Sequence, residues 1–470
     1  MIWLILLFAL ILRVINLNQG LWLDEAISAL AARDYSYIGI VRDFLPGDTH
    51  PPLYYLSLKL WTEFFGFSEI SLRSLSVVFG VMTVYVVYLI GRKVKNKKLG
   101  IIASLFFATA PLHIYYSQEV RMYALSTLAV SLSVYGYLFV LKKAKTKNWI
   151  LFSLSLLFIG LVDYLPLLIL PVFWVYAYLK KRGKSWWRGF LLSHLPLLAF
   201  LVVWFPIFYK QTLGSRAALI SFPAWGELLG KANLKELSLV WIKFIIGRIP
   251  IEQNFVFGLL ITFVSIPFVY ALFRGFKQRR NAGIFWLWLI LPLAISFLGS
   301  FFVPGFSFFR LLFVLPAFYL LITYGVSKSK FARPLIIVIL GLNLIFSSVY
   351  IFNQKHRRED WRGAVNFVEE RAREDLAVLM AFPEPFAPYR WYSKNTQIAH
   401  GVRGFGDSKG QVASRLEKAV GKQQNIYTFD YLMDVSDHQR YVYQGLEDFG
   451  FFQKEVYNFR GIGQVRLWER

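Results

Sequence analysis

Long apolar runs with almost no charge constrain this chain more than any other feature of its sequence. They recur from Ile2 to Phe352, mostly as runs of about 17–20 residues, the length of helix that crosses about 30 Å of hydrocarbon. Apolar residues make up 56% of the 470 residues, and the mean hydropathy is +0.48, more than a soluble globular protein shows. The sequence therefore predicts a polytopic α-helical membrane protein.

The positive charge of the chain is concentrated between the apolar runs. The formal net charge is +24, with 34 Lys or Arg and 12 Asp or Glu up to Asn353, against 18 and 16 from Gln354 onward. The excess lies in five clusters that occupy every second loop: Arg92–Lys98, Lys142–Lys147, Lys180–Arg188, Arg274–Arg280 and Lys328–Arg333. This is the positive-inside pattern of cytoplasmic loops beside anionic lipid. We therefore interpret the clusters as topology determinants, and nucleic-acid binding is excluded.

Eleven spans, or as many as thirteen, follow from the apolar runs and the basic clusters. The eleven lie at 2–18, 70–91, 99–113, 122–141, 149–162, 164–179, 189–209, 254–273, 284–303, 309–325 and 334–352. An odd number places the N-terminus in the cytoplasm and the chain after about Gln354 outside the plasma membrane. The first run lacks a basic start and a cleavage site, so we expect it to be retained as a span. The chain has no Cys, so we expect neither a disulfide nor a thiolate metal site.

Two external stretches interrupt the predicted spans. The first loop, about residues 19–68, has amphipathic patterns near 25–44 and 53–66 that suit helices lying in the membrane interface. The second stretch, Lys210–Gln253, contains a similar pattern in LKELSLVWIKFIIGRI.

The tail has a different character, which divides the chain into residues 1–353 and residues 354–470. In the tail, DWRGAVNFVEERARE has helical period, whereas LAVLMAF, NIYTFDYL and GQVRLWER indicate strands. We expect a transmembrane catalytic domain followed by a small extracytoplasmic α/β domain.

Two adjacent acids follow the first predicted span, in GLWLDEAISAL. Asp24 and Glu25 stand where a helix is expected to begin, and the macrodipole favours acids at any such position. A structural role is therefore the simplest interpretation of the pair taken alone. A catalytic role needs support from other residues on the same membrane face.

Two further motifs place polar groups on that face. His50 precedes two prolines in DTHPPLYYLSLKLW, where the prolines fix the chain ahead of a helix. Glu119 and Arg121 lie in YYSQEVRMYAL, at the outer turn before the next span. Alone, His50 reads as a turn residue and Arg121 as an interfacial anchor, because long side chains snorkel. Their placement together with Asp24 favours a shared site.

Taken in order, the motifs resemble the protein mannosyltransferase-like group of GT-C fold glycosyltransferases. They are L-W-x-D-E, H-P-P-L-Y-Y, FSEISLRSLS and Y-S-Q-E-x-R-M-Y-A-L, and FFRLLFVLP at 308–316 resembles the group's later Arg-bearing span. The group is related to dolichyl-phosphate-mannose protein mannosyltransferases and to bacterial aminoarabinose transferases. The match is dense over about residues 20–125 and looser beyond.

The resemblance implies an inverting glycosyltransferase that moves a sugar from a polyprenyl-phosphate donor to a lipid, glycan or protein acceptor. Asp24 matches the family's catalytic acid, and a carboxylate is a sufficient base once an oxocarbenium-like carbon is waiting. Glu25 is expected to orient the acceptor or to tune the electrostatics around Asp24. Asp24, Glu25 and His50 include usable ligand types for a divalent metal, but the sequence does not fix their geometry.

Arg121 is expected to hold the donor phosphate, because a guanidinium grips two phosphate oxygens and stays charged. Arg310 is a second candidate, with snorkelling to the interface as the alternative. Arg73 is expected to be structural, paired with Glu69 at i,i+4. Four further residues are assigned to substrate binding: His50, Tyr54, Glu119 and Tyr123.

A transporter or flippase for a lipid-linked substrate is the alternative function. It predicts charges deep inside spans and inverted repeats, whereas this chain has charges at loop edges and no detectable repeat. Asp163, in LVDYLPLL, either replaces a polar group found in the family or closes a tight turn. The large sugar-binding repeats of eukaryotic protein mannosyltransferases are absent, so a protein acceptor is not favoured over lipid or polysaccharide.

Overall fold

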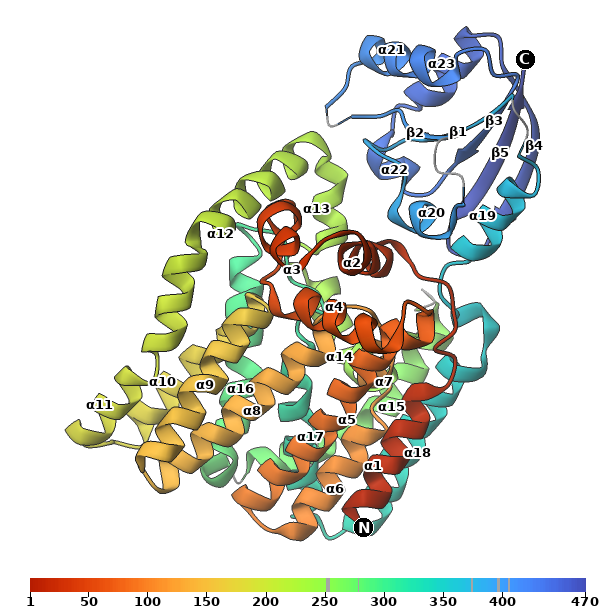
Figure 1. The fold of residues 1–470 in the computed structure, drawn as a ribbon. Coiled ribbons are helices and arrows are strands. Elements are labelled where there is room, and N and C mark those ends of the chain that lie inside the picture. Colours follow the sequence, from red (N-terminus) through yellow and green to blue (C-terminus); the bar gives the residue numbers. More distant parts are fainter. Residues whose placement is uncertain (251–253, 278, 373–374, 395–397, 405) are drawn as a thin grey trace.

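A helical bundle carries an α/β region at one end (Figure 1). The computed structural model describes residues 1–250, 254–277, 279–372, 375–394, 398–404 and 406–470, without the side chains of 227–228 and 279–281. The N-terminus lies at the end of the bundle opposite the α/β region.

Six helical stretches in the described residues are long and apolar enough to cross a membrane. They are α5 (Glu69–Val94), α8 (Tyr123–Lys142), α11 (Lys184–Leu192) with α12 (Leu195–Ser221), α15 (Phe255–Phe276), Ala282–Gly299 within α16 (Arg279–Gly299), and α18 (Ala332–Phe352). The pair α6 (Lys97–Ala108) and α7 (Pro111–Ser117), bent by 64°, makes a seventh if it is one span.

Shorter apolar helices occupy the remaining predicted spans. They are α1 (Ile2–Val14), α9 (Thr146–Val162), Leu165–Leu179 ending in α10 (Leu170–Leu179), and Leu312–Val326 ending in α17 (Leu315–Val326). Each predicted span thus overlaps an apolar helix, although six or seven stretches meet the length of a span.

Two helix ends differ from the prediction. α1 ends at Val14 rather than near residue 18, because Asn16 adopts a left-handed backbone conformation with φ of 64°. α12 continues to Ser221 rather than ending at residue 209, so the predicted external stretch begins inside a helix. In this extension, Gln211 donates hydrogen bonds to the carbonyls of Leu45 at 2.8 Å and His50 at 3.0 Å, which fixes the first loop. The rest of the second stretch forms α13 (Pro223–Leu229) and α14 (Leu234–Ile246), and residues 251–253 lie outside the described residues.

Buried polar side chains stand where apolar helices break. At the bend between α6 and α7, Arg13 donates from Nη1 to the Ala108 carbonyl at 2.9 Å, which satisfies a group that the break leaves free. After α9, Asp163 accepts a hydrogen bond from the Ser126 hydroxyl on α8 at 3.4 Å. Asp163 therefore has a partner on a neighbouring helix.

The basic clusters meet at one end of the bundle. Four contacts connect residues in or next to different clusters. The Lys93 ammonium lies 3.7 Å from the centre of the Phe139 ring. Hydrogen bonds run from Lys95 to Ser327 Oγ at 2.8 Å, from Arg182 to the Leu141 carbonyl at 2.9 Å and from Arg274 to the Lys328 carbonyl at 2.7 Å. This is the end away from the α/β region (Figure 1). Residue 278 of the Arg274–Arg280 cluster lies outside the described residues.

The first loop covers the opposite end of the bundle. It forms α2 (Leu23–Asp34), α3 (Tyr37–Gly39), two short helical turns at Ile40–Phe44 and Leu45–Gly47, and α4 (Leu53–Phe65). These helices coincide with the amphipathic patterns near 25–44 and 53–66. Acids in the first turn of α2 complement its N-terminal dipole.

The α/β region contains a five-stranded sheet in the order β2-β1-β3-β5-β4. Its strands are β1 (Leu376–Met380), β2 (Ala399–Gly401), β3 (Asn425–Phe429), β4 (Phe452–Phe459) and β5 (Gly463–Glu469). β1 pairs in parallel with β2 and β3, and β5 pairs antiparallel with β3 and β4. The helices are α19 (Trp361–Glu369), α20 (Ala387–Tyr392), α21 (Lys409–Val420), α22 (Met433–Ser436) and α23 (Tyr441–Asp448), and a short turn at Gln354–His356 leads in from α18.

Candidate active site at the first loop

Asp24 and Glu25 are adjacent on the first turn of α2, but their carboxylates have opposite surroundings. Glu25 is fully buried, and it accepts hydrogen bonds from Arg73 Nε at 2.9 Å and from the Val120 N–H at 3.0 Å. Asp24 is half-buried, and its carboxylate makes no hydrogen bond or ion pair with any described residue. Asp24 is therefore the free carboxylate of the pair.

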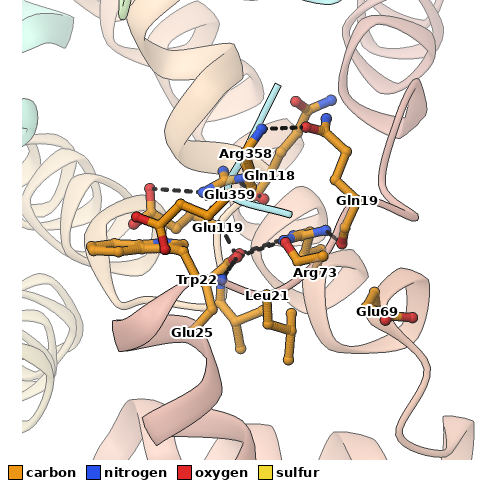
Figure 2. A network of polar contacts seen from close by, with 12 residues as sticks. Gln19, Leu21, Trp22, Glu25, Glu69, Arg73, Gln118, Glu119, Arg358 and Glu359 are labelled. Carbon is orange, nitrogen blue, oxygen red and sulfur yellow. Dashed lines mark hydrogen bonds and ion pairs between the residues drawn. The ribbon is translucent and has the colours of Figure 1, made fainter. Parts of the chain in front are cut away.

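The predicted ion pair between Arg73 and Glu69 is wrong. Arg73 is buried and pairs with Glu25, which lies 48 positions away, and it also donates to carbonyls of the first loop (Figure 2). Glu69 instead pairs with Arg362 of α19 and accepts a hydrogen bond from the Tyr392 hydroxyl at 3.0 Å. A spacing of four residues permits an ion pair along a helix. A buried guanidinium, however, needs an acceptor for each of its N–H groups, and the first loop supplies the carboxylate and the carbonyls that accept from Arg73.

The charges around Glu25 keep this residue ionised. Burial by itself opposes ionisation, but the positive charges of Arg358 and Arg73, with hydrogen bonds from Arg73 and Val120, hold the pKa of Glu25 below its ordinary value. A carboxylate that is saturated in this way cannot accept a further proton readily. The geometry gives Glu25 the task of anchoring α2 beside Asp24.

His50 lies in a second polar cluster, with Arg121, Tyr55 and a residue that the sequence analysis did not single out, Asp48. Asp48 accepts hydrogen bonds from His50 Nδ1 at 2.7 Å and from the Tyr55 hydroxyl at 3.0 Å. Arg121 Nη1 donates to the same hydroxyl at 3.1 Å, and its Nη2 lies 3.4 Å from His50 Nδ1. Burial alone would raise the pKa of Asp48, but His50 and Arg121 lower it to about 2. In the sequence, D-T-H before two prolines is typical of a capped turn, so Asp48 was not predicted as a site residue.

Arg121 is buried between this cluster and Asp24. Burial would lower the pKa of Arg121, but Tyr55 and the carboxylates of Asp24 and Asp48 hold it well above its ordinary value. Its Nε has no hydrogen-bond partner among the described residues. A fixed positive charge therefore stands within electrostatic reach of the free carboxylate.

Tyr123 lies among the other candidate site residues of the sequence analysis. It is within electrostatic reach of four of them: Asp24, Glu119, Arg121 and Arg310. Its ring packs edge-on against Phe309 at 5.5 Å. Tyr54 is buried behind them, with its hydroxyl 3.2 Å from Ser76 Oγ. The proposed residues thus come from separate elements to one region at one end of the bundle.

Glu119 is a buried carboxyl with an incomplete set of partners. Its Oε2 lies 3.8 Å from Arg358 Nη1 and has no hydrogen-bond partner among the described residues. Burial raises the pKa of Glu119 to about 7, and Glu25 and Asp24 add to the rise, although Arg358 and Arg248 oppose it. Glu119 is therefore able to change its protonation near neutral pH.

The sequence analysis did not single out two basic residues at the end of α14, Lys243 and Arg248. Arg248 is exposed, with its guanidinium 5.4 Å from the Phe308 ring and 5.8 Å from the Tyr115 ring. Lys243 is buried, and burial together with the charge of Arg248 lowers the pKa of Lys243 to about 8. The half-buried Arg310 lies 5.9 Å from the neighbouring Phe309 ring. The amphipathic pattern of LKELSLVWIKFIIGRI predicted the helix. A helical period does not show which distant residues Lys243 and Arg248 contact, so their positions could not be predicted.

A mainly apolar groove of about 830 Å³ lies between α14 and α15. It is lined on α14 by residues including Leu237 and Trp241, and on α15 by residues from Ile261 to Phe273. Trp241 Nε1 donates to Ser265 Oγ at 3.0 Å across its floor. The groove therefore shares α14 with Lys243.

In the described part of the chain, no three His, Asp or Glu side chains are grouped so that they hold a metal ion. The proposed ligands Asp24, Glu25 and His50 are accordingly separated: Glu25 faces Arg73, and His50 faces Asp48.

Comparison with known proteins shows the fold. The chain is similar to the crystal structure of ArnT from Cupriavidus metallidurans in the apo state, with a TM-score of 0.59 and 13% identity over 99% of this chain and 97% of that one. The same protein bound to undecaprenyl phosphate gives 0.61 and 12% over the same shares. The archaeal oligosaccharyltransferase AglB from Archaeoglobus fulgidus, in complex with an inhibitory peptide and a dolichol-phosphate, gives 0.54 and 11% over 99% and 74%.

The family described as dolichyl-phosphate-mannose-protein mannosyltransferase matches residues 49–209. This match covers about a third of the chain, so it is a similarity over that segment. The matched residues run from just before α4 into α12 and include His50, Glu119 and Arg121, whereas Asp24 lies before them. The family and these structural neighbours are glycosyltransferases. No curated protein sequence matches the chain.

Proposed function

We propose that this chain is a GT-C type, inverting glycosyltransferase that moves a sugar from a polyprenyl-phosphate donor to a hydroxyl of a lipid, polysaccharide or protein acceptor at the external membrane face. The observation that carries the proposal is the free carboxylate of Asp24, held within electrostatic reach of Arg121. Base and cation are the two groups that displacement of a phosphate by a hydroxyl requires.

The proposed arrangement has eleven spans, a cytoplasmic N-terminus, a catalytic transmembrane domain at residues 1–353 and an extracytoplasmic domain at residues 354–470. The convergence of the basic clusters at the end away from the α/β region supports it, because Lys- and Arg-rich loops stay in the cytoplasm. Asp24 and the α/β region then lie outside the plasma membrane.

In the proposed reaction, Asp24 accepts the proton of the acceptor hydroxyl. The hydroxyl oxygen forms a bond to the anomeric carbon as the bond from that carbon to the phosphate oxygen breaks, and the bonding electrons leave with polyprenyl phosphate. Attack opposite the leaving group inverts the anomeric centre. No general acid is needed, because a lipid phosphate is already a good leaving group.

The donor phosphate is held by arginines. Arg121 contributes a buried fixed charge, and Arg310 and Arg248 stand beside the aromatic rings of Phe308 and Phe309, where a phosphate reaches them from the membrane side. The groove between α14 and α15 suits the polyprenyl tail, since it is mainly apolar and one of its walls is α14, the helix that precedes Arg248.

Purified protein with a panel of labelled polyprenyl-phosphate sugars, and membranes of a gene-deletion strain as acceptor, tests the proposal. We expect transfer from at least one donor, with inverted stereochemistry, and loss of one glycan from the envelope of the deletion strain by mass analysis. EDTA in the same assay tests for a divalent ion. If no donor is consumed but the protein moves labelled lipid across vesicles, it is a flippase and the proposal fails.

A further inference from the structure

The segment that joins α18 to the sheet lies directly against the first loop. The Arg358 N–H donates to Gln19 Oε1 at 2.8 Å, and Arg358 Nη2 donates to the Gln118 carbonyl at 3.0 Å (Figure 2). A Cβ on Gly20 would lie 3.1 Å from the Glu359 carbonyl oxygen, so only a small residue fits there without a shift. Residues 358 and 359 are therefore part of the same packed unit as α2.

Arg358 lies between two acids of the site, Glu25 on α2 and Glu119 between α7 and α8. Its side chain is 2% exposed, and its Nη1 lies 3.8 Å from both Glu25 Oε2 and Glu119 Oε2. Its guanidinium also stacks over the Tyr115 ring at 4.7 Å. Since breaking these contacts would leave a buried charge unpaired, the position of the segment relative to the site is fixed.

Glu359 follows Arg358, and three parts of the α/β region hold its side chain. Its carboxylate accepts hydrogen bonds from Trp361 Nε1 at 2.8 Å and from the Tyr431 hydroxyl at 3.1 Å. Gly461, in the β4–β5 turn with φ of 78°, packs so closely that a Cβ would lie 2.7 Å from Glu359 Cγ. A carboxylate has about four acceptor positions, so two donors leave room for a further hydroxyl.

Glu359 lies within electrostatic reach of the free carboxylate of Asp24, and the residue before it, Arg358, contacts the neighbouring Glu25. Burial raises the pKa of Glu359 to about 7; the hydrogen bonds from Trp361 and Tyr431 oppose the rise, and the charges of Asp24 and Glu25 add to it. The Tyr431 hydroxyl is also within electrostatic reach of Asp24. The α/β region thus holds a second carboxyl, half-buried and fixed by two hydrogen bonds, within electrostatic reach of the proposed base.

We propose that Glu359 is an acceptor-binding residue, which accepts a hydrogen bond from a second hydroxyl of the acceptor and holds the first hydroxyl at Asp24, with Arg358 as its positioning residue. The inference rests on the proposed glycosyl transfer. It specifies an acceptor with neighbouring hydroxyls, which means a saccharide unit rather than an isolated Ser or Thr hydroxyl.

The test uses the full-length protein, a labelled polyprenyl-phosphate sugar that the wild type consumes, and graded amounts of deletion-strain membranes as acceptor. Glu359→Gln is expected to raise the apparent KM for the membranes about 10–100-fold, the effect of weakening a hydrogen bond to a charged group. Competition by undecaprenyl phosphate should not change, and hydrolysis of the donor by water should rise relative to transfer. Glu359→Asp should recover part of the loss, and the exposed control Glu447→Gln should match the wild type.

Equal losses in transfer and in donor hydrolysis with an unchanged KM would show that Glu359 is only structural, and wild-type kinetics would also overturn the inference. If Glu359→Gln does not fold, Tyr431→Phe keeps the carboxylate but frees it, and the same rise in KM is expected. Failure of the wild type to consume any donor would instead contradict the proposed function itself.

Discussion

The two ends of the helical bundle use the same charged residue types in opposite ways. At the basic end, side chains such as Lys97 and Lys147 are exposed in the first turns of α6 and α9, so that each carries its charge independently of a buried partner. At the opposite end, Glu25, Arg73 and Arg358 are buried and neutralise one another. At the basic end, the total positive charge of the loops is expected to determine how the protein is oriented in the membrane. At the opposite end, what matters is which individual charged groups contact one another. Substitutions should therefore have small effects at one end and large effects at the other.

The largest effect on stability is expected for Glu25→Gln. This change leaves the Arg73 guanidinium buried beside a neutral group, and breaking a buried pair from one side costs about 3–5 kcal/mol. Thermal unfolding in detergent should show a large fall in Tm. The matched control is Glu69→Gln, since its partner Arg362 is half-exposed and such pairs contribute about 0–1 kcal/mol. Equal shifts for the two variants would contradict the difference between the ends.

Arg121→Lys should lower the rate of sugar transfer about 10–100-fold with little change in Tm. Lysine keeps the charge but loses the fork that contacts Tyr55 and that we propose holds the donor phosphate. Steady-state kinetics with a donor from the panel measures this. Arg33→Lys, on the exposed end of α2, is the control and should keep the wild-type rate. An unchanged rate for Arg121→Lys would remove Arg121 from the phosphate site.

Glu119→Gln should change how stability depends on pH. The pKa of Glu119 is raised from 4.5 to about 7, so the folded protein binds this proton more tightly than the unfolded chain. Its contribution is therefore fully present below about pH 4.5 and is lost as pH rises through 7. At pH 8 the variant should be more stable than the wild type by about 3 kcal/mol, and near pH 4 the two should match. A constant difference in Tm from pH 5 to 8 would show that Glu119 does not titrate there.

The smallest effects are expected for single cysteines placed far from the site, which also test sidedness because the chain has no Cys of its own. Lys97→Cys and Lys409→Cys should both keep transfer within about twofold of the wild type, since exposed substitutions rarely disturb a fold. In intact cells, an impermeant thiol reagent should label position 409 but not position 97. The reverse pattern would invert the proposed topology.

Local patterns predicted the elements that have a local cause. The first-loop helices followed from amphipathic period, and β1, β3 and β5 fall on the apolar stretches LAVLMAF, NIYTFDYL and GQVRLWER. β4 was missed because its residues are mostly exposed and lack a buried face. The end of α1 was misplaced because apolarity continues through Leu17, whereas the helix stops before Asn16.

Long-range partners had no such local signal. Arg73 was matched to Glu69 because the spacing allowed it, while its true partner Glu25 lies in another element. Asp48 was hidden within a turn motif. Glu359, in the tail, comes within electrostatic reach of Asp24 because Arg358 and the β4–β5 turn hold it at the first loop. The sequence indicated which residues to consider for a site and the structure brings most of them to one end of the bundle, but only the fold shows that Glu25 is paired while Asp24 is free.

The most direct test of glycosyl transfer at this site is the turnover of Asp24→Asn. The variant should transfer sugar at least about 10³-fold more slowly than the wild type, because a general base is lost while charge-stabilising groups remain. Binding of undecaprenyl phosphate and Tm should stay close to those of the wild type, and Asp34→Asn, at the exposed end of the same helix, should retain full activity. Undiminished turnover by Asp24→Asn would contradict the assignment of the base.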